Sequence, residues 1–142
     1  MAGIPREVYE HFERIPLFSG VSKKGLRRIV AAADEITVRE GKDLVREGDH
    51  GRHLYVVVDG SARVIRGGRK VATLGPGDFF GELALISGAP RTATVQTETE
   101  TTVMVLDPRR FDVVMDQEPR VAKAVMATMA DRLRILERSI TH

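Results

Sequence analysis

The chain has 142 residues, of which 42% are hydrophobic and 30% are charged, and its formal net charge is +2. This length and composition are typical of one soluble globular domain, and no apolar run approaches the ~20 residues that a membrane span requires. The absence of cysteine excludes disulfides, thiolate nucleophiles and cysteine metal sites.

The first 33 residues are expected to form helices. The sequence up to Ile15 lacks the basic-then-apolar order of a secretion signal, so we expect a cytoplasmic protein. Between Pro5 and Ile15 the apolar residues recur at spacings of four and three, which predicts a short amphipathic helix. Pro16 to Gly20 reads as a turn, and Ser22 is the expected N-cap of a second helix. The apolar face of that helix consists of Leu26, Ile29, Val30 and Ala33.

Two basic pairs, Lys23-Lys24 and Arg27-Arg28, fall on the polar face of this second helix. Nucleic-acid binding surfaces usually combine a basic stripe with aromatic residues, and aromatic residues make up only 5% of the chain. We therefore interpret these pairs as solvated charges and do not expect this chain alone to bind nucleic acid.

From Asp34 to Leu106 the apolar pattern changes to the alternation of β-strands. Short alternating or β-branched segments are separated by Asp-Gly, Gly-Gly and Gly-Pro-Gly steps, which is the signal of a sandwich or barrel. The predicted strands lie at residues 34–38, 44–45, 53–58, 62–66, 70–74, 92–97 and 102–106. With roughly eight strands between terminal helices, a closed sheet is the expected architecture.

Two helices are predicted after the strands. Asp107 is the expected N-cap and Pro108 the first residue of a helix that continues to Met115. Glu118-Pro119 then begins a last helix of about 20 residues with one long apolar seam. The seam consists of Val121, Val125, Met129, Leu133, Leu136 and Ile140. We expect it to be buried against the strands, against a second copy of the chain, or against both.

The stretch FGELALISGAPRTATV, residues 80–95, combines features that packing alone does not require. Gly81 permits close approach of the backbone, and a short helix starting there would direct free N–H groups at an anion. Arg91 offers a planar set of donors suited to phosphate oxygens, and Glu82 can accept from a sugar hydroxyl. The alternative is that Glu82 and Arg91 form a surface ion pair over the turn between them.

The same stretch resembles the phosphate-binding cassette of the cyclic nucleotide-binding domain family. The match is nearly gapless over FGELAL, ISGAP and RTATV. IPLFSGVS is similar to the N-terminal helical motif of the family, and EGKDLVREGDHGRHLYVVVDGSARV is similar to its first strands. The resemblance therefore extends from about Ile15 to Leu136.

The resemblance implies a mainly β fold with flanking helices. Its centre is an eight-stranded β-jelly roll that contains a short cassette helix, followed by a hinge helix and a lid helix. We expect one cyclic nucleotide-binding domain over residues 1–142. N-terminal helices would occupy residues 1–33, the roll residues 34–106 with the cassette at 80–92, and the hinge and lid helices residues 107–142.

The resemblance also implies roles for individual residues. Arg91 is similar to the arginine that binds the cyclic phosphate, and Glu82 to the acid that takes the ribose 2′-hydroxyl. The remaining contacts would come from the backbone N–H groups of Gly81, Leu83, Ala84 and Thr92.

The base-binding residues are less defined by the sequence. Thr92 stands where cyclic-GMP-selective members offer a hydroxyl to guanine. The favoured alternative is a strand threonine bonded to the phosphate or to the backbone, so Thr92 does not decide between cyclic AMP and cyclic GMP. Leu136 and Glu137 stand where the catabolite activators use polar residues to reach adenine, which departs from that pattern. Arg132 or Arg134 could stack over the base instead. The candidate lining of the base pocket, with core packing as the alternative, consists of Val64, Val71 and Leu74.

We therefore predict a sensor of a cyclic nucleotide, with cyclic AMP as the first choice, whose binding repositions the last helix toward an unknown effector. The alternatives are the sensor part of a catabolite-activator-type transcription regulator and a homodimerisation module with an unused pocket. The last helix ends near the end of the sequence, so we expect no DNA-reading helix here. His50 and His53 could suggest a cupin-type metal enzyme, but HGRH reads more simply as a loop, and we expect neither catalysis nor a metal.

Overall fold

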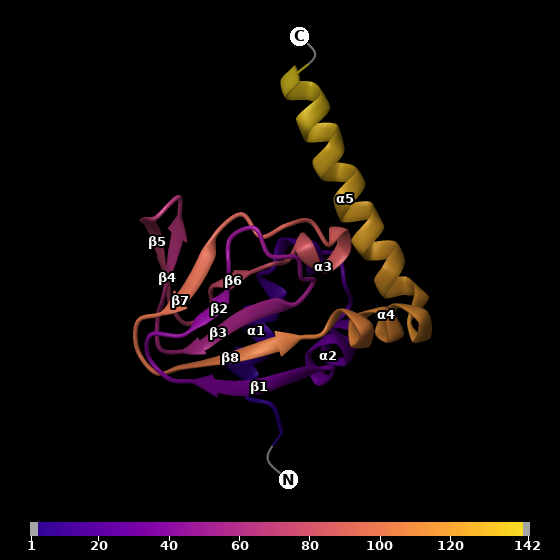
Figure 1. Cartoon of the computed structure of the whole chain (residues 1–142). Helices are drawn as coiled ribbons and strands as arrows, with labels where there is room; N and C mark the ends of the chain where they lie inside the picture. The colour runs from indigo at the N-terminus through magenta and orange to yellow at the C-terminus, as the bar shows by residue number, and fades with distance from the viewer. Residues whose placement is uncertain (1–2, 141–142) are drawn as a thin grey trace.

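The computed structural model describes residues 3–140, with side chains as far as Arg138. Eight strands form two four-stranded antiparallel sheets, one in the order β1-β8-β3-β6 and the other in the order β2-β7-β4-β5 (Figure 1). The strands are β1 (Ala33–Val38), β2 (Asp43–Val45), β3 (Leu54–Asp59), β4 (Ala62–Arg66), β5 (Arg69–Leu74), β6 (Phe79–Phe80), β7 (Thr94–Thr97) and β8 (Thr101–Leu106). The expected mainly β roll with flanking helices is confirmed.

The helices flank the roll at both ends of the chain. They are α1 (Arg6–Glu13), the 3₁₀ turn η1 (Pro16–Phe18), α2 (Lys23–Ala31), α3 (Ala84–Ser87), α4 (Pro108–Gln117) and α5 (Pro119–Ile140). Two predicted caps are confirmed. Ser22 Oγ accepts from the Gly25 N–H at 3.1 Å, and Asp107 Oδ1 accepts from the Arg109 N–H at 2.7 Å. Each cap satisfies an N–H group that the first helical turn leaves without a partner.

The main core lies between the helices and the sheet that contains β3 and β8. Phe18 is central to it, with ring centroids 6.5 Å from Phe12 and 5.9 Å from Phe111. The fully buried side chains also include Ile15, Leu17, Ile29, Val30, Leu54, Val56, Leu85 and Leu106. The apolar faces predicted from the sequence therefore pack into one core, which fixes the position of the sheet relative to α2 and α4.

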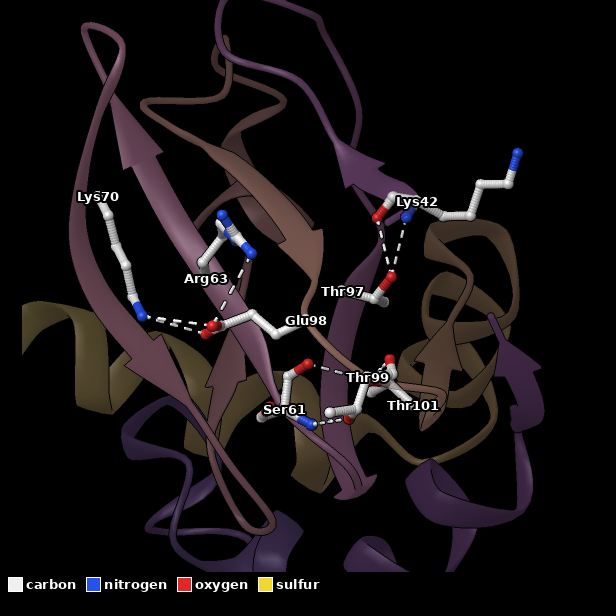
Figure 2. A network of polar contacts seen from close by, with 8 residues as sticks. All are labelled: Lys42, Ser61, Arg63, Lys70, Thr97, Glu98, Thr99 and Thr101. Carbon is white, nitrogen blue, oxygen red and sulfur yellow. Dashed lines mark hydrogen bonds and ion pairs between the residues drawn. The ribbon is translucent and has the colours of Figure 1, made fainter. Parts of the chain in front are cut away.

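A polar network fastens the turn between β7 and β8, at the end of the roll away from α4 (Figure 2). Glu98 pairs with Lys70 at 3.3 Å and with Arg63 at 3.9 Å, which ties the turn to β4 and β5. Thr97 Oγ1 accepts from the Lys42 N–H at 2.9 Å, which ties it to the start of β2. The network continues through Ser61, Thr99 and Thr101. These contacts tie the turn to three strands of the second sheet, β2, β4 and β5.

The strand pattern departs from expectation in two places. Phe79–Phe80 forms the short strand β6 against β3, although no strand was predicted there, because pairing with β3 decides it rather than any local signal. In β1, Ile36 points into solvent although the alternation predicted a buried side chain. Among the described strands β1 is an edge of its sheet and has β8 as its one neighbour, and none of its residues is fully buried.

The apolar seam of α5 is buried only in its first half. Val121 and Val125 pack into the core, whereas Leu133 and Leu136 are 59% and 57% exposed. Ile140 lies outside the described side chains. Figure 1 shows the reason, because α5 leaves the body of the protein after its first turns and projects away from the roll. Of the two expected burial partners, the strands do not cover the second half of the described seam, and burial against a second copy of the chain stays a prediction.

Candidate functional site

A cavity of about 580 Å³ opens between the second sheet and the segment around α3. Its lining comes from β2, β4, β6, β7 and the stretch between residues 81 and 93, so the predicted cassette forms one wall. The lining includes all six residues that the sequence placed at the ligand, namely Gly81, Glu82, Leu83, Ala84, Arg91 and Thr92.

Arg91 is the central charged group of this wall. Its side chain lines the cavity, yet the residue is only 9% exposed. Its Nη2 donates to the carbonyl of His53 at 2.9 Å, and its backbone N–H donates to the carbonyl of Asp49 at 2.8 Å. Burial lowers the pKa of Arg91, while the nearby Tyr55 acts in the opposite direction. Among residues 3–140 no carboxylate forms an ion pair with this guanidinium, so its charge is held in a fixed position and left uncompensated.

Gly81 makes the close packing around Arg91 feasible. Its φ is +87°, and a Cβ at this position would lie 2.6 Å from Arg91 Nη1 and 2.6 Å from the His53 carbonyl oxygen. No other residue fits there without displacing the guanidinium or the strand. The Leu85 N–H donates to the Gly81 carbonyl at 3.0 Å, so the helical turn opens at Gly81 although α3 itself begins at Ala84.

The first amides of this turn face no backbone acceptor. In the described part of the chain, the N–H groups of Glu82, Leu83 and Ala84 have no hydrogen-bond acceptor. Together with Arg91 they give the wall a surplus of donors. Such a surface suits an anion with several acceptor oxygens.

Glu82 does not pair with Arg91. Its Oε2 accepts from the Leu17 N–H at 3.1 Å, and its Oε1 accepts from Arg132 Nη2 at 3.1 Å. The carboxylate therefore joins the cavity wall to η1 on one side and to α5 on the other. The surface ion pair considered as the alternative is not formed.

The remaining lining is mostly apolar. Tyr55 stacks on Phe80 with ring centroids 4.7 Å apart, and burial raises the pKa of Tyr55, an effect that Arg91 opposes. Arg66 donates from Nε to the Thr92 carbonyl at 3.2 Å. The apolar lining residues include Val45, Val64, Leu74, Phe79, Phe80 and Val95. The cavity thus combines one polar wall with an apolar pocket, as small-molecule sites generally do.

The sequence-predicted base residues separate into two groups. Val64 and Leu74 line the cavity, whereas Val71 is outside its lining and points into solvent. Arg132 is engaged by Glu82, Arg134 pairs with Asp131 within α5, and Leu136 lies farther along that helix. None of these three lines the cavity in this structure.

Several lining residues escaped the sequence analysis. Arg66, Phe79 and Phe80 were not predicted, and neither was the contact of the Leu17 N–H with Glu82. Arg66 lies in β4, and nothing in the residues around it indicates that its side chain faces a cavity. The two phenylalanines before Gly81 were the available signal, since pockets are lined mostly by hydrophobic and aromatic side chains.

The two histidines of HGRH do not converge. His50 Nδ1 lies 3.4 Å from the Gly88 carbonyl, and His53 Nε2 lies 3.7 Å from Asp107 Oδ2. Within residues 3–140 no three His, Asp or Glu side chains gather as a metal ion would require. None of the helices in the described part of the chain combines the length and apolar character that crossing a bilayer requires.

The comparisons with known proteins agree with this geometry. The cyclic nucleotide-binding domain profile matches residues 35–130. The chain is 37% identical over 109 residues to a cAMP-dependent protein kinase regulatory subunit of Schizosaccharomyces pombe, covering 75% of this chain and 26% of that protein. The chain spans between 21% and 36% of the length of such curated relatives.

Solved structures show the same fold. The N-terminal domain of a transcriptional regulator from Streptomyces coelicolor superimposes with a TM-score of 0.80 and 34% identity, covering 89% of this chain and 94% of that one. The regulatory domain of Toxoplasma gondii PKA, crystallised with cAMP, gives a TM-score of 0.66 and 34% identity, covering 79% and 46%. With a profile match over more than half its length, the chain belongs to the cyclic nucleotide-binding domain family.

Proposed function

We propose that the chain is a regulatory sensor that binds a cyclic nucleotide, cyclic AMP in the first instance, in the cavity beside α3. The observation that carries the proposal is Arg91. A guanidinium that is buried, positioned by the His53 carbonyl and left without a carboxylate partner requires an anion to compensate its charge. A cyclic phosphate supplies that anion.

The other groups of the wall fit the rest of such a ligand. The N–H groups of Leu83 and Ala84 have no acceptor in the described protein and can donate to phosphate oxygens. Glu82 can accept from a ribose 2′-hydroxyl. The apolar side chains of Val64 and Leu74 offer a surface for the base.

The choice of cyclic AMP over cyclic GMP rests on similarity to a kinase regulatory domain crystallised with cAMP. Thr92 lines the cavity and can offer its hydroxyl to guanine. One neutral hydrogen bond contributes about 0.5–1.5 kcal/mol, about tenfold in affinity, so Thr92 biases the preference without deciding it.

We further propose that binding repositions α5. Glu82 already accepts a hydrogen bond from Arg132, so a ribose hydroxyl that reaches Glu82 must share the carboxylate with α5 or displace it. The ligand thereby changes the relative free energies of two positions of the helix. In this proposal the module regulates rather than catalyses, and the movement of α5 acts on an effector.

Isothermal titration calorimetry with cyclic AMP and cyclic GMP in parallel tests the proposal. Linear 5′-AMP is the control, because it keeps the base and ribose but lacks the cyclic phosphate. We expect one cyclic nucleotide bound per chain and weaker or undetectable binding of 5′-AMP. Absence of binding of both cyclic nucleotides would contradict the proposal.

One alternative for the output has specific support. The structure that superimposes with a TM-score of 0.80 is the N-terminal domain of a transcriptional regulator, so this module can serve as the sensor of such a regulator. The exposed apolar residues Met126 and Leu133, seven positions apart on one face of α5, suit a homodimer through this helix. Light scattering with and without cyclic AMP distinguishes a ligand-dependent dimer from a monomeric sensor.

A further inference from the structure

Arg52 lies in the loop before β3 and bridges two helices that are distant in sequence. Its Nε and Nη2 donate to the carbonyl of Leu85 at 3.1 and 2.9 Å, and its Nη2 also lies 3.4 Å from Asp112 Oδ1. Leu85 belongs to α3 in the cavity wall, whereas Asp112 belongs to α4. One guanidinium therefore contacts α3, which supplies part of the cavity wall, and α4, the helix that precedes α5.

The hydrogen bonds from Arg52 to the Leu85 carbonyl satisfy an acceptor at the end of α3. A helix of four residues cannot satisfy its own last carbonyl groups, so an external donor fixes its position. The stem of Arg52 also passes close to Gly88, where a Cβ would lie 3.4 Å from the Arg52 Cγ and Cδ. Arg52 thus lies against the end of α3.

The next residue extends the connection to the phosphate-binding arginine. The His53 carbonyl accepts from Arg91 Nη2 at 2.9 Å, and its imidazole lies 3.7 Å from Asp107, the N-cap of α4. Residues 52 and 53 therefore contact Arg91, α3 and two points of α4. Any shift of Arg91 or α3 on binding an anion acts directly on this segment.

We infer that Arg52 is a positioning residue that couples occupancy of the cavity to the position of α4. This inference rests on the proposed function and adds to it the residue that transmits the change. If Arg52 transmits the effect of ligand binding to α4, removal of its side chain must reduce the ligand-induced change in α4 and not only the stability of the fold. Binding and response must change together, because coupling between two sites is reciprocal.

Amide hydrogen exchange of residues 108–117, measured with and without saturating cyclic AMP, tests the inference on Arg52→Gln. Arg46→Gln is the matched control, because Arg46 also bonds an aspartate, Asp43, at 3.1 Å but contacts neither α3 nor α4. We expect a ligand-induced change in α4 in the parent and the control, and its loss in Arg52→Gln. The affinity of Arg52→Gln should fall about three- to tenfold, as expected for the loss of one or two hydrogen bonds.

Asp112→Asn is the second variant and keeps the inference testable if Arg52→Gln fails to fold. It keeps Arg52 on α3 but removes the carboxylate on α4, so the α4 response should fall with less change in affinity. An undiminished α4 response in Arg52→Gln, or in Asp112→Asn where Arg52→Gln does not fold, would overturn the inference while leaving the proposed function intact. An α4 that does not respond in the parent would do the same. Absence of binding to the parent would overturn both.

Discussion

Glu82 and Arg132 form an ion pair at 3.1 Å that joins the wall of the cavity to α5, across 50 positions of sequence. The second oxygen of Glu82 accepts from the Leu17 N–H. The carboxylate that we propose to bind the ribose is therefore also the group through which the cavity wall contacts α5.

Arg132→Gln should loosen α5. Loss of this partly buried pair costs about 1 kcal/mol of local stability, which corresponds to about fivefold faster amide exchange across residues 119–138. In the parent we also expect cyclic AMP to increase protection from Leu133 to Arg138, and this increase should disappear in the variant. Arg138→Gln, on the same helix, is the control and should behave as the parent. Equal exchange in all three proteins would show that the pair does not hold the helix.

Arg91→Ala should abolish most nucleotide binding. Each charge-assisted hydrogen bond to phosphate contributes about 1.5–3 kcal/mol, so we expect a ten- to thousandfold loss of affinity by calorimetry. The melting temperature without ligand should change little, because removal of an uncompensated buried charge offsets the loss of its hydrogen bond to the His53 carbonyl. Arg69→Ala, an exposed position on β5, serves as the control. Equal affinity in Arg91→Ala and the parent would reject the phosphate assignment.

Glu82→Gln should weaken binding less than Arg91→Ala but should change specificity. The parent should discriminate against 2′-deoxy cyclic AMP by the strength of a hydrogen bond to a carboxylate, about 1.5–3 kcal/mol. The variant should lose much of this discrimination. The measurement is the ratio of the two dissociation constants in each protein, and an unchanged ratio would mean that Glu82 does not bind the ribose.

Gly81→Ala should damage both the site and the fold. The new Cβ would lie 2.6 Å from Arg91 Nη1 and from the His53 carbonyl oxygen, at a φ of +87°. Gly41→Ala is a close control, because its φ is +81° but nothing lies within 4 Å of the new Cβ. Both variants should lose about 1 kcal/mol from backbone strain, and Gly81→Ala should lose more and also bind cyclic AMP at least about tenfold more weakly. Equal effects of the two variants would contradict the close packing around Arg91.

Asp107→Ala should cost about 1 kcal/mol of unfolding free energy at pH 7, as expected for loss of an N-cap. The pKa of Asp107 is lowered, chiefly because its carboxylate accepts the Arg109 N–H, and the small burial of the group opposes this. A lowered pKa means that the stabilisation is present above the ordinary pKa of aspartate and is lost as the pH falls through the folded-state value. The difference from the parent should therefore shrink between about pH 5 and pH 3 in denaturant titrations. Asp116→Ala, exposed on the same helix, should show no such trend.

The sequence by itself determined the features that depend on neighbours a few residues apart. The caps at Ser22 and Asp107, the turns that separate the strands and the apolar faces of the helices all follow from short-range hydrogen bonds and periodicity. The residues around Arg91 also resembled the family's cassette closely enough to predict the family, and the family is confirmed.

Tertiary structure alone decided which partners those residues meet. An ion pair between Glu82 and Arg91, nine positions apart, was the alternative that the sequence left open, but the contacts of Glu82 are Leu17 and Arg132, at separations of 65 and 50. The strand β6 exists only because β3 lies beside it, and α5 is buried only as far as η1 and α4 reach. Such contacts depend on which surfaces the folded chain brings together. The sequence pattern indicates that a side chain is buried or paired, but it does not identify the residue that it contacts.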